Sequence, residues 1–310
     1  MKVSLVLISF NQERYIEDAI KSALNQDYSN LEIIISDDAS SDSTTRKIES
    51  LISSYSGGHK IVLNVNTTNL GLVGNFEKAM SLSSGEIIIA AAGDDISLPY
   101  RVAETVNLLN NHPRATFVSF SDHVIDENGV IIYRAKKRRN QVARVVSFHD
   151  YMNGLAGHLS GASRGFRRSV ANKFGSLLPD SQTEDSTYLL RCLIMGEGVV
   201  SEKPGILYRK HTNNLSGAAN IGRLNIDRLI SQYRLDVRKG VADGLIDTDT
   251  EVLIDKWIAK VEARRKMDMF INNANPNFKF FFRNIFLGGL YNRGEQLDYF
   301  KKFLKKSIKI

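Results

Sequence analysis

The amino-acid sequence predicts an α/β protein with a doubly wound, mostly parallel sheet and a helical C-terminal extension. Two observations lead to this prediction. Short apolar segments alternate with helical patterns through residues 1–113, which is typical of parallel strands joined by helices. From about residue 219 onward the apolar spacing is helical, and no clear strand follows.

The elements of the first part follow from their residue types. Residues 3–9 form a continuous apolar run, as expected for a strand that is covered on both faces. The same reasoning predicts strands at 31–36, 61–66 and 86–92, with helices between them at 13–24, 44–55 and 75–82. The next part mixes short strands at 116–119 and 130–133 with loops and an apolar helix near 186–195.

The length of 310 residues exceeds that of a typical single domain, so one large domain and an appendage are expected. We place the large domain at residues 1–218, with a first half over about 1–113 and a second half over about 114–218. The basic helical extension then occupies residues 219–310. An apolar fraction of 43% and a charged fraction of 24% are those of a soluble globular protein.

The sequence gives no sign of a targeting segment or a membrane span. Residues 3–8 are apolar, but Ser9 and Asn11 end the run far short of a signal peptide. No stretch reaches the roughly 20 apolar residues of a spanning helix. The single cysteine, Cys192, excludes an internal disulfide and lies in an apolar run, which favours a buried thiol. A cytoplasmic protein is therefore expected.

The formal net charge of +7 is concentrated near the C-terminus, because residues 270–310 contain eight Lys or Arg against two acids. Such a segment favours an anionic partner. In a helix over residues 297–306, Leu297, Phe300 and Leu304 share one face and lysines spread around the other, as in interfacial helices. Two interpretations stay open: peripheral binding at the inner face of the cell membrane, or packing on the large domain.

A second basic run covers residues 134–139. No nucleic-acid-binding module frames this run, and aromatic residues are not interleaved with its basic side chains. We therefore interpret it as a solvated loop and expect no nucleic-acid partner.

Carboxylates follow several of the predicted strands. Asp37 and Asp38 follow the second strand, Asp94 and Asp95 follow the fourth, and Asp185 comes much later at the start of the apolar helix. Ligands of doubly wound sheets bind at the carboxyl ends of the strands. Two adjacent acids repel each other unless a cation or hydrogen-bond donors compensate them, and Mg²⁺ prefers one or two carboxylates together with phosphate oxygens. The pattern therefore predicts a divalent cation, Mn²⁺ or Mg²⁺.

Part of this acidity has a simpler interpretation. Asp42 and Ser43 stand before a predicted helix, where such residues serve as N-caps. Glu184 stands in the first turn of the apolar helix, where the helix dipole favours an acid.

Together, the motifs over roughly residues 1–215 resemble those of the inverting family 2 glycosyltransferases, which have a GT-A fold. The motifs that carry the resemblance are Ser9-Phe10-Asn11, the acidic segment 37–44, Asn69-Leu70-Gly71 with Asn75, residues 85–88, Gly93-Asp94-Asp95, Glu184-Asp185 and Tyr208-Arg209-Lys210-His211. One departure is Gly93, which stands where many members of the family have a further Asp.

The resemblance implies a role for each of these positions. Phe10 would stack on the nucleobase, Asp38 would bind the pyrimidine ring, and Asp94 would contact the ribose or the sugar. The residues implied in binding the nucleotide-sugar donor are Ser9, Phe10, Asn11, Glu13, Asp38, Asn75 and Asp94. The implied metal ligands are Asp95 and His211, the implied general base is Asp185, and the implied acceptor contacts are Glu184 and Gly161. For His211, a solvated loop position is the alternative.

The expected function is inverting transfer of a sugar from a UDP- or dTDP-linked donor to a glycan or lipid-linked saccharide, in polysaccharide biosynthesis. A metal would stabilise the diphosphate leaving group, and a carboxylate base contributes about 10²–10⁴-fold. A nucleotidyltransferase is one alternative, but residues 9–13 lack the Gly-rich, basic phosphate loop of those enzymes. A non-catalytic sugar-nucleotide or carbohydrate-binding module is the other, and it would have no need of Asp185.

Overall fold

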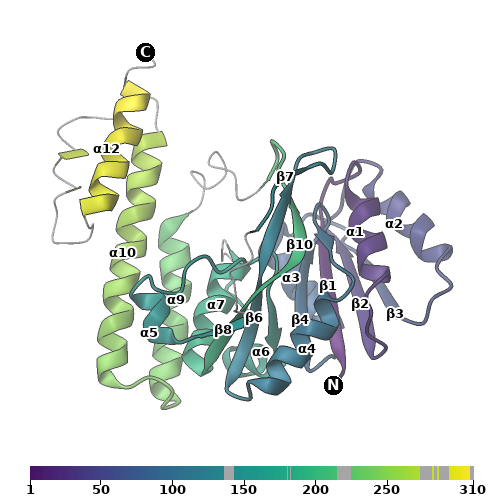
Figure 1. Ribbon diagram of the computed structural model, residues 1–310, viewed down its shortest axis with the longest axis horizontal. Helices are drawn as coiled ribbons and strands as arrows, with labels where there is room; N and C mark the ends of the chain where they lie inside the picture. Colours follow the sequence, from purple (N-terminus) through teal and green to yellow (C-terminus); the bar gives the residue numbers. More distant parts are fainter. Residues whose placement is uncertain are drawn as a thin grey trace. The chain divides into compact units, whose positions relative to one another are not determined.

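The computed structural model describes residues 1–135, 143–179, 181, 183–214, 225–272, 281–282, 285 and 293–307 (Figure 1). The chain divides into two compact units, Met1–His211 and Thr212–Ile310. The boundary predicted after residue 218 falls in the segment 215–224, which lies outside the described residues. The same holds for residues 136–139 of the second basic run.

The first unit is built on one mixed sheet. Among the described residues it has ten strands, in the order β3-β2-β1-β4-β9-β6-β10-β5, with β7 beside β6 and β8 beside β10. The strands are β1 (Val3–Ser9), β2 (Leu31–Asp37), β3 (Lys60–Val65), β4 (Ile87–Ala92), β5 (Ile96–Ser97), β6 (Ala115–Ile125), β7 (Ile131–Tyr133), β8 (Ala143–Val146), β9 (Gly165–Arg167) and β10 (Glu197–Arg209).

Strand direction changes across this sheet. β3, β2, β1 and β4 are parallel neighbours, and so are β6 and β10. The short strand β9 joins these two groups and runs antiparallel to both β4 and β6. The predicted α/β fold with a mostly parallel sheet is confirmed.

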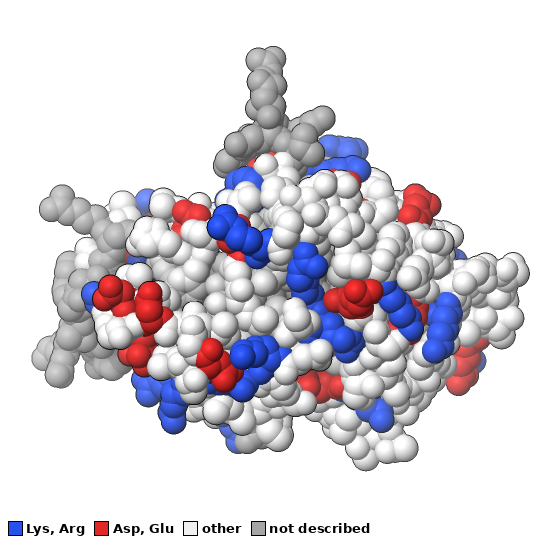
Figure 2. Space-filling view, turned by 90° about the horizontal axis from the view of Figure 1, so that it is seen from below, with Lys and Arg blue, Asp and Glu red and all other residues white. Residues whose placement is uncertain are grey.

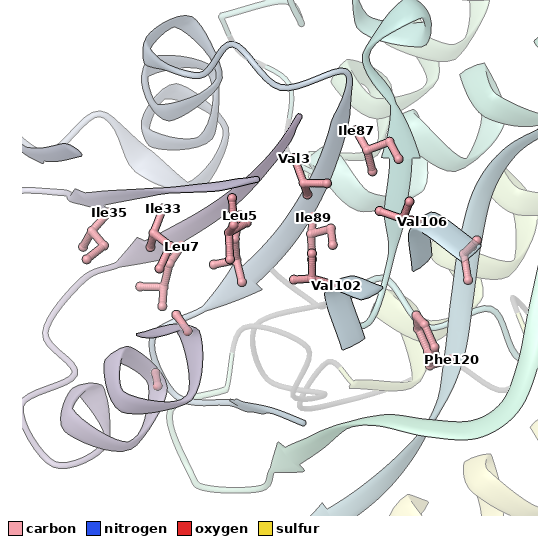
Figure 3. Close-up of a cluster of buried hydrophobic side chains, with 14 of the residues drawn as sticks. Val3, Leu5, Leu7, Ile33, Ile35, Ile87, Ile89, Val102, Val106 and Phe120 are labelled. Carbon is pink, nitrogen blue, oxygen red and sulfur yellow. The ribbon is translucent and has the colours of Figure 1, made fainter. Parts of the chain in front are cut away.

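Helices cover both faces of the sheet (Figure 1). The helices of the first unit are α1 (Ile16–Leu24), α2 (Thr44–Ser53), α3 (Gly71–Leu82), α4 (Arg101–Asn111), α5 (Phe148–Met152), α6 (Arg168–Phe174) and α7 (Glu184–Met195). Alternate residues of β1 point to opposite faces. Leu5 belongs to the core cluster shared with α1 and α4 (Figure 3), while Val6 on the other face is equally buried at 0% exposure. This double burial is why the strand is a continuous apolar run.

Two predicted boundaries differ from the structure for physical reasons. The helix predicted from residue 13 begins at Ile16, because residues 9–13 form a loop that is bonded to the loop after β2. The 13-residue strand β10 was not predicted, and it contains Pro204, which lacks a backbone N–H. Its pairing with β6 shifts register on both sides of Pro204, so a bulge accommodates the proline.

The second unit is helical in the part that the structure describes, with α9 (Ile226–Ala242), α10 (Thr248–Asn272) and α12 (Arg293–Ser307). Within this unit α12 packs on α10, where Tyr299 and Phe303 join a buried cluster with Met267 and Ile271. Of the predicted apolar face, Phe300 packs against this cluster, whereas Leu297 and Leu304 are exposed. No described helix is long and apolar enough to cross a membrane.

Several basic residues of the C-terminal segment lie outside what the structure describes. These are Lys279, Arg283 and Lys309, together with the side chains of Arg293, Lys305 and Lys306. On the face shown in Figure 2, Lys and Arg side chains are interspersed with Asp and Glu, so the positive net charge does not gather there into one basic field.

A buried ion pair secures the amino ends of the strands. Glu32 on β2 is 1% exposed, and its carboxylate accepts hydrogen bonds from the Ser4 hydroxyl at 2.6 Å and the Ser84 backbone N–H at 2.6 Å. Lys2 Nζ lies 2.6 Å from Glu32 Oε2. Burial alone would raise the pKa of Glu32, but Lys2, Ser4 and Ser84 together lower it to about 2.

Replacing Glu32 tests this pair. The folded state holds Glu32 ionised with a pKa of about 2, against 4.5 for the free side chain, so the pair stabilises the fold above about pH 4.5. This stabilisation disappears as the pH falls from 4.5 toward 2. We expect Glu32→Gln to lower the free energy of unfolding at pH 7 by up to about 3 kcal/mol, measured by urea titration.

The difference between wild type and Glu32→Gln should shrink as the titration is repeated from pH 5 down to pH 2. Glu49→Gln, an exposed change on α2, is the matched control. A Glu32→Gln penalty that stays constant over that range would contradict the ion-pair explanation.

Candidate active site

Two loops at the carboxyl ends of β1 and β2 are bonded to each other. The Ser9 hydroxyl donates to Asp37 Oδ1 at 2.9 Å, and the Asp38 backbone N–H donates to the Ser9 carbonyl oxygen at 2.9 Å. The Asp37 carboxylate also accepts from the Ser40 backbone N–H and hydroxyl and from the Thr45 hydroxyl. Asp37 is fully buried, and its carboxylate serves to hold the loop.

Asn11 and Glu13 complete this bonding. Asn11 has φ 50°, a left-handed conformation that asparagine tolerates better than most residues. Its Oδ1 accepts from the Ser41 backbone N–H at 2.9 Å, while Glu13 Oε2 accepts from the Ser43 backbone N–H at 3.0 Å. Both side chains bind the second loop, and their contact with a nucleotide stays a prediction. The neighbouring Phe10 is 46% exposed, which leaves its ring accessible to a ligand.

Asp42, two residues before Thr44, accepts hydrogen bonds from nearby backbone N–H groups. Asp42 Oδ1 accepts from the Thr44 backbone N–H at 2.9 Å and Asp42 Oδ2 from the Glu13 backbone N–H at 3.1 Å. The Ser43 side chain makes no capping bond to α2. Burial would raise the pKa of Asp42, but the hydrogen bonds from Thr44 and Glu13 lower it. This agrees with the capping interpretation of Asp42.

Asp38 lies at the end of β2 and is 2% exposed. Its Oδ1 accepts from the Leu70 backbone N–H at 2.8 Å and from Asn66 Nδ2 at 2.9 Å. Its Oδ2 has no hydrogen-bond partner among the residues that the structure describes. The second oxygen of Asp38 can therefore accept a hydrogen bond from a ligand.

Asn75 on α3 is bonded to strand β2 instead of standing free. It is 2% exposed, its Oδ1 accepts from the Ser36 hydroxyl at 2.6 Å and from Asn66 at 3.1 Å, and its Nδ2 donates to the Ser36 carbonyl at 3.0 Å. Asn75 therefore orients Asn66, which in turn binds Asp38. Direct contact of Asn75 with a nucleoside stays a prediction.

The Gly-Asp-Asp segment after β4 is held by the end of β10. Asp94 Oδ2 lies 3.0 Å from His211 Nε2, and Asp95 Oδ1 accepts from the Arg209 backbone N–H at 2.8 Å. Burial, followed by the charge of Asp94, raises the pKa of Asp95 well above its usual value. The His211 side chain is 6% exposed and stacks on Tyr15, with the ring centroids 4.7 Å apart. A solvated loop position for His211 does not agree with this burial.

A side chain at Gly93 would require neighbouring side chains to move. A Cβ atom built at this position would lie 2.2 Å from Gln12 Oε1, 2.9 Å from Ile16 Cδ1 and 3.1 Å from Ser9 Cβ. Glycine at this position, where many members of the family have a further Asp, therefore coincides with close packing of the neighbouring loop.

Arg209 is a functional candidate that the sequence reasoning missed. Its Nε donates to the Asp94 carbonyl oxygen at 2.9 Å and its Nη2 lies 2.9 Å from Asp18 Oδ2. Its guanidinium also lies 4.9 Å from the centroid of the Tyr15 ring. Arg209 is 1% exposed, so it fixes the backbone of the acidic segment. The signal was its place beside His211 in the motif 208–211.

These residues suit a divalent cation that takes most of its ligands from elsewhere. No three His, Cys, Asp or Glu side chains form a complete metal site within the described part of the chain. Asp95 Oδ2 has no hydrogen-bond partner among the described residues, and burial beside Asp94 disfavours its charge. A cation bound through one or two carboxylates would compensate that charge, and it keeps positions for phosphate oxygens and water. The residues present therefore fit such a cation.

The predicted base and acceptor residues lie together at the start of α7. A Cβ atom at Gly161 would lie 2.5 Å from Asp185 Oδ2, so the loop 159–163 contacts the exposed Asp185 side chain. Glu184 Oε2 is buried and has no hydrogen-bond partner among the described residues. Burial, followed by the charge of Asp185, raises the pKa of Glu184 to about 7.

The loop 159–163 also approaches the acidic segment. Arg101 Nη2 donates to the Ala162 carbonyl at 3.1 Å and to the Ala90 carbonyl of β4 at 2.6 Å. Asp122 on β6, which the sequence reasoning missed, lies near enough to Asp95 to raise its pKa further. Burial in turn raises the pKa of Asp122, against Ser160, His158, Ser163 and Arg101. Asp38 thus follows β2, and Asp94 and Asp95 follow β4, the two strands that flank β1. The loop 159–163 links the segment after β4 to Asp185.

The family and the fold are established by comparison. A family model described as "Glycosyl transferase family 2" matches residues 4–175. The chain superposes on S. aureus TarS 1–349 in complex with UDP-GlcNAc with a TM-score of 0.65 at 15% identity, covering 100% of this chain and 92% of that one. It superposes on the mannosyltransferase PcManGT from Pyrobaculum calidifontis, in complex with GDP-Man and Mn²⁺, with a TM-score of 0.57 at 17% identity, covering 99% and 87%. The fold is GT-A.

Two curated relatives match over a shorter segment. "Putative glycosyltransferase EpsE" of Bacillus subtilis is 36% identical over 129 residues, which are 42% of this chain and 46% of the relative. A Campylobacter jejuni protein named "GalNAc(5)-diNAcBac-PP-undecaprenol beta-1,3-glucosyltransferase" is 38% identical over 94 residues, 30% of each chain. The chain thus spans less than half the length of these relatives. Because the family model covers more than half of its residues, the chain belongs to glycosyl transferase family 2.

Proposed function

We propose that this protein transfers a sugar, with inversion, from a nucleoside diphosphate donor to a saccharide acceptor. The observation that carries the proposal is the arrangement at the carboxyl edge of the sheet. Asp94 Oδ2 and His211 Nε2 are 3.0 Å apart, and Asp94 is next to Asp95 in sequence. The loop 159–163 leads from this acidic segment to Asp185. Such a transfer needs groups that bind the diphosphate at one end of the site and a general base at the other end.

The nucleotide would bind at the ends of β1 and β2. The ring of Phe10, 46% exposed, offers a stacking surface, and Asp38 Oδ2 is available to accept from a pyrimidine N–H. A pyrimidine donor, UDP- or dTDP-linked, suits one carboxylate acceptor at this place. The structural neighbour TarS binds UDP and UDP-GlcNAc, which supports a uridine donor. Asp94 would then contact the ribose or the sugar.

Asp95 and His211 would hold a Mn²⁺ or Mg²⁺ ion, with Asp94 beside them. The bound ion would stabilise the negative charge that develops on the diphosphate leaving group. The chain's own part is to orient these ligands: Arg209 fixes both the Asp94 carbonyl and the Asp95 carboxylate, and Tyr15 stacks on His211. The neighbour PcManGT was solved with Mn²⁺, which supports this assignment.

Asp185 would accept the proton of the acceptor hydroxyl. Its side chain is exposed, so an incoming saccharide can reach it. Burial, followed by the charge of Asp185, raises the pKa of Glu184 to about 7, so Glu184 is mostly protonated below neutral pH. Attack from the side opposite the leaving group would invert the anomeric carbon. Glu184 and Gly161 stand where acceptor hydroxyls would bind.

The two other classes of function explain less. A nucleotidyltransferase would need basic side chains on the phosphate loop, whereas residues 9–13 bind the next loop through Asn11 and Glu13. A non-catalytic binding module would have no use for an exposed carboxylate at Asp185 beside the acceptor loop. Release of nucleoside diphosphate from a sugar donor separates an enzyme from such a module.

Asp185→Asn tests the base. The substitution keeps the shape of the side chain and removes its basicity, so we expect kcat to fall about 10²–10⁴-fold. The affinity for UDP, measured by calorimetry, should stay unchanged, because the nucleotide site proposed at the ends of β1 and β2 does not include Asp185. Turnover is followed as UDP released from UDP-GlcNAc, and the anomeric configuration of the product is read by NMR.

Asp27→Asn, an exposed acid before β2, is the matched control and should behave as wild type. Near-full turnover by Asp185→Asn, or a product with retained configuration, would refute the base assignment.

His211→Ala tests the metal assignment. Removal of one ligand should weaken Mn²⁺-dependent UDP binding on the order of 10-fold, a typical size for a perturbed metal site. Binding of UDP without Mn²⁺ should not change. Calorimetry of the two variants with and without the ion measures both quantities, with His149→Ala, exposed on α5, as the control. Equal affinity of wild type and His211→Ala in Mn²⁺ would remove His211 from the ligand set.

We further propose that the acceptor is a lipid-linked saccharide of polysaccharide biosynthesis. The protein would reach this acceptor by binding the membrane surface through α12. The name of the Campylobacter relative includes an undecaprenol-linked saccharide, which supports such an acceptor. On α12 the exposed Leu297, at 53%, and Leu304, at 36%, each lie about one turn from exposed Lys301. Exposed leucines among lysines suit the interface of an anionic membrane.

Flotation with vesicles rich in phosphatidylglycerol tests the membrane proposal. Wild-type protein should float with the vesicles, less so at high salt, and the double variant Leu297→Glu/Leu304→Glu should stay in the dense fraction. Leu155→Glu, at a 69% exposed leucine of the first unit, is the control. Equal flotation of the double variant and the control would show that α12 does not mediate binding.

A further inference from the structure

Arg101, the first residue of α4, is buried at 1% exposure and reaches three segments of the chain. Its Nη1 donates to Ser97 Oγ at 2.9 Å, and its Nη2 donates to the carbonyls of Ala90 at 2.6 Å and Ala162 at 3.1 Å. Ala90 precedes the Gly-Asp-Asp segment and Ser97 follows it. Arg101 therefore connects both flanks of the acidic segment to the loop 159–163.

This guanidinium bears a charge without a direct ion pair. No carboxylate lies within salt-bridge distance of it in the described part of the chain, and burial lowers the pKa of Arg101 to about 10, with Asp122 and Asp95 opposing. It is still charged at neutral pH. Burial of a charge is costly, and an apolar residue could fill the same space. What the planar guanidinium adds is several donors of fixed geometry that reach separate acceptors at once.

Arg164 continues the connection. Its carbonyl oxygen accepts from the Ala90 backbone N–H at 3.1 Å and lies 3.5 Å from Arg101 Nη2. Its own side chain is 3% exposed, with Nη1 bonded to the Asp185 carbonyl and Nη2 to the Leu159 carbonyl at 3.4 Å. The backbone of Arg164 is thus anchored at β4, and its side chain is anchored at the start of α7.

We propose that Arg101 and Arg164 form a brace, a continuous set of hydrogen bonds that fixes Asp185 relative to Asp94 and Asp95. The inference rests on the proposed function, since it concerns the distance between base and leaving group in that reaction. Both arginines are positioning residues, because the hydrogen bonds of their side chains go to backbone carbonyls and to Ser97. Displacement of a catalytic group by about 1 Å costs on the order of 10²-fold in rate, so a brace of this kind acts on kcat.

The brace also accounts for the glycine at position 161. Loop 159–163 is drawn toward β4 by Arg101 through Ala162 and toward α7 by Arg164 through Leu159. At that separation a Cβ at position 161 would lie 2.7 Å from Asp185 Cβ. Only glycine permits the loop to lie this close to the base.

Arg164→Lys and Arg101→Lys test the brace. Lysine keeps the charge, but its one nitrogen cannot occupy both positions that the Nη1 and Nη2 atoms of each arginine take up. We expect kcat for UDP release from UDP-GlcNAc to fall about 10²-fold in each variant. The KM for UDP-GlcNAc and the Kd for UDP with Mn²⁺ should change less than about twofold, since the nucleotide-binding strand ends are untouched. Hydrogen exchange should become faster in the amides of residues 184–187.

Arg167→Lys is the matched control. Arg167 on β9 also binds two backbone carbonyls, those of Ala115 and Leu109, both at 2.7 Å, without touching either the acidic segment or α7. Its replacement should lower the melting temperature comparably and leave kcat unchanged. If Arg101→Lys does not fold, Arg164→Lys, which leaves the Arg101 contacts in place, decides the outcome.

Two results would overturn the brace: equal kcat in Arg164→Lys and Arg167→Lys, or a loss of kcat accompanied by an equal loss of UDP affinity. A different result would overturn the proposed function instead. This is wild-type protein that binds none of UDP, dTDP and GDP in the presence of Mn²⁺ and releases no nucleotide from their sugar derivatives. The positioning role would then fall with it, whatever the exchange data show.

Discussion

The structure of the first unit depends on one electrostatic constraint: several carboxylates must lie close together at one edge of a sheet without driving that edge apart. Parallel strands bring Asp38 and Asp94 to this edge because β1 pairs with both β2 and β4 in the same direction. The chain compensates the accumulated charge with backbone N–H groups and with buried arginines. Arg209 binds Asp95 through its N–H and Asp18 through its guanidinium. Compensation remains incomplete at Asp95, and this is the position where a cation is most favourable.

The opposite edge of the sheet solves the same problem in another way. There Glu32 receives Lys2 and two serines, so its charge is fully compensated within the protein. The contrast separates a structural acid from a candidate ligand-binding one. A carboxylate whose oxygens are all bonded stabilises the fold, while Asp38, Asp95 and Asp185 each keep capacity for a ligand. The same comparison places Asp37 and Asp42 with the structural acids, although Asp37 is adjacent to Asp38 in sequence.

The sequence predicted the strands that are buried on both faces, but it did not predict the short strand β9 or the buried charged residues. Strands β1 and β4 could be predicted because burial on both faces makes them mostly apolar runs, and β2 because it is short and rich in β-branched residues. β9 has three residues and pairs only with strands that are distant in sequence, so no local residue pattern predicts it. The acids of the site could be predicted by residue type and order. Arg101, Arg164 and Asp122 could not, because charged residues are usually exposed and only the tertiary structure shows the two arginines buried and Asp122 partly buried.

The crowding at Gly93 has a consequence for substitution at this position. Gln12 Oε1 occupies the space that the first atom of a side chain at position 93 would need, and Ile16 and Ser9 approach it from two more sides. An aspartate at position 93 would therefore require the Gln12 side chain to adopt another rotamer and the terminal methyl group of Ile16 to shift. Gln12 Oε1 is buried and has no hydrogen-bond partner among the described residues, so moving it breaks no hydrogen bond of that oxygen. The residue at position 93 is in this sense coupled to the rotamer of its neighbour at position 12.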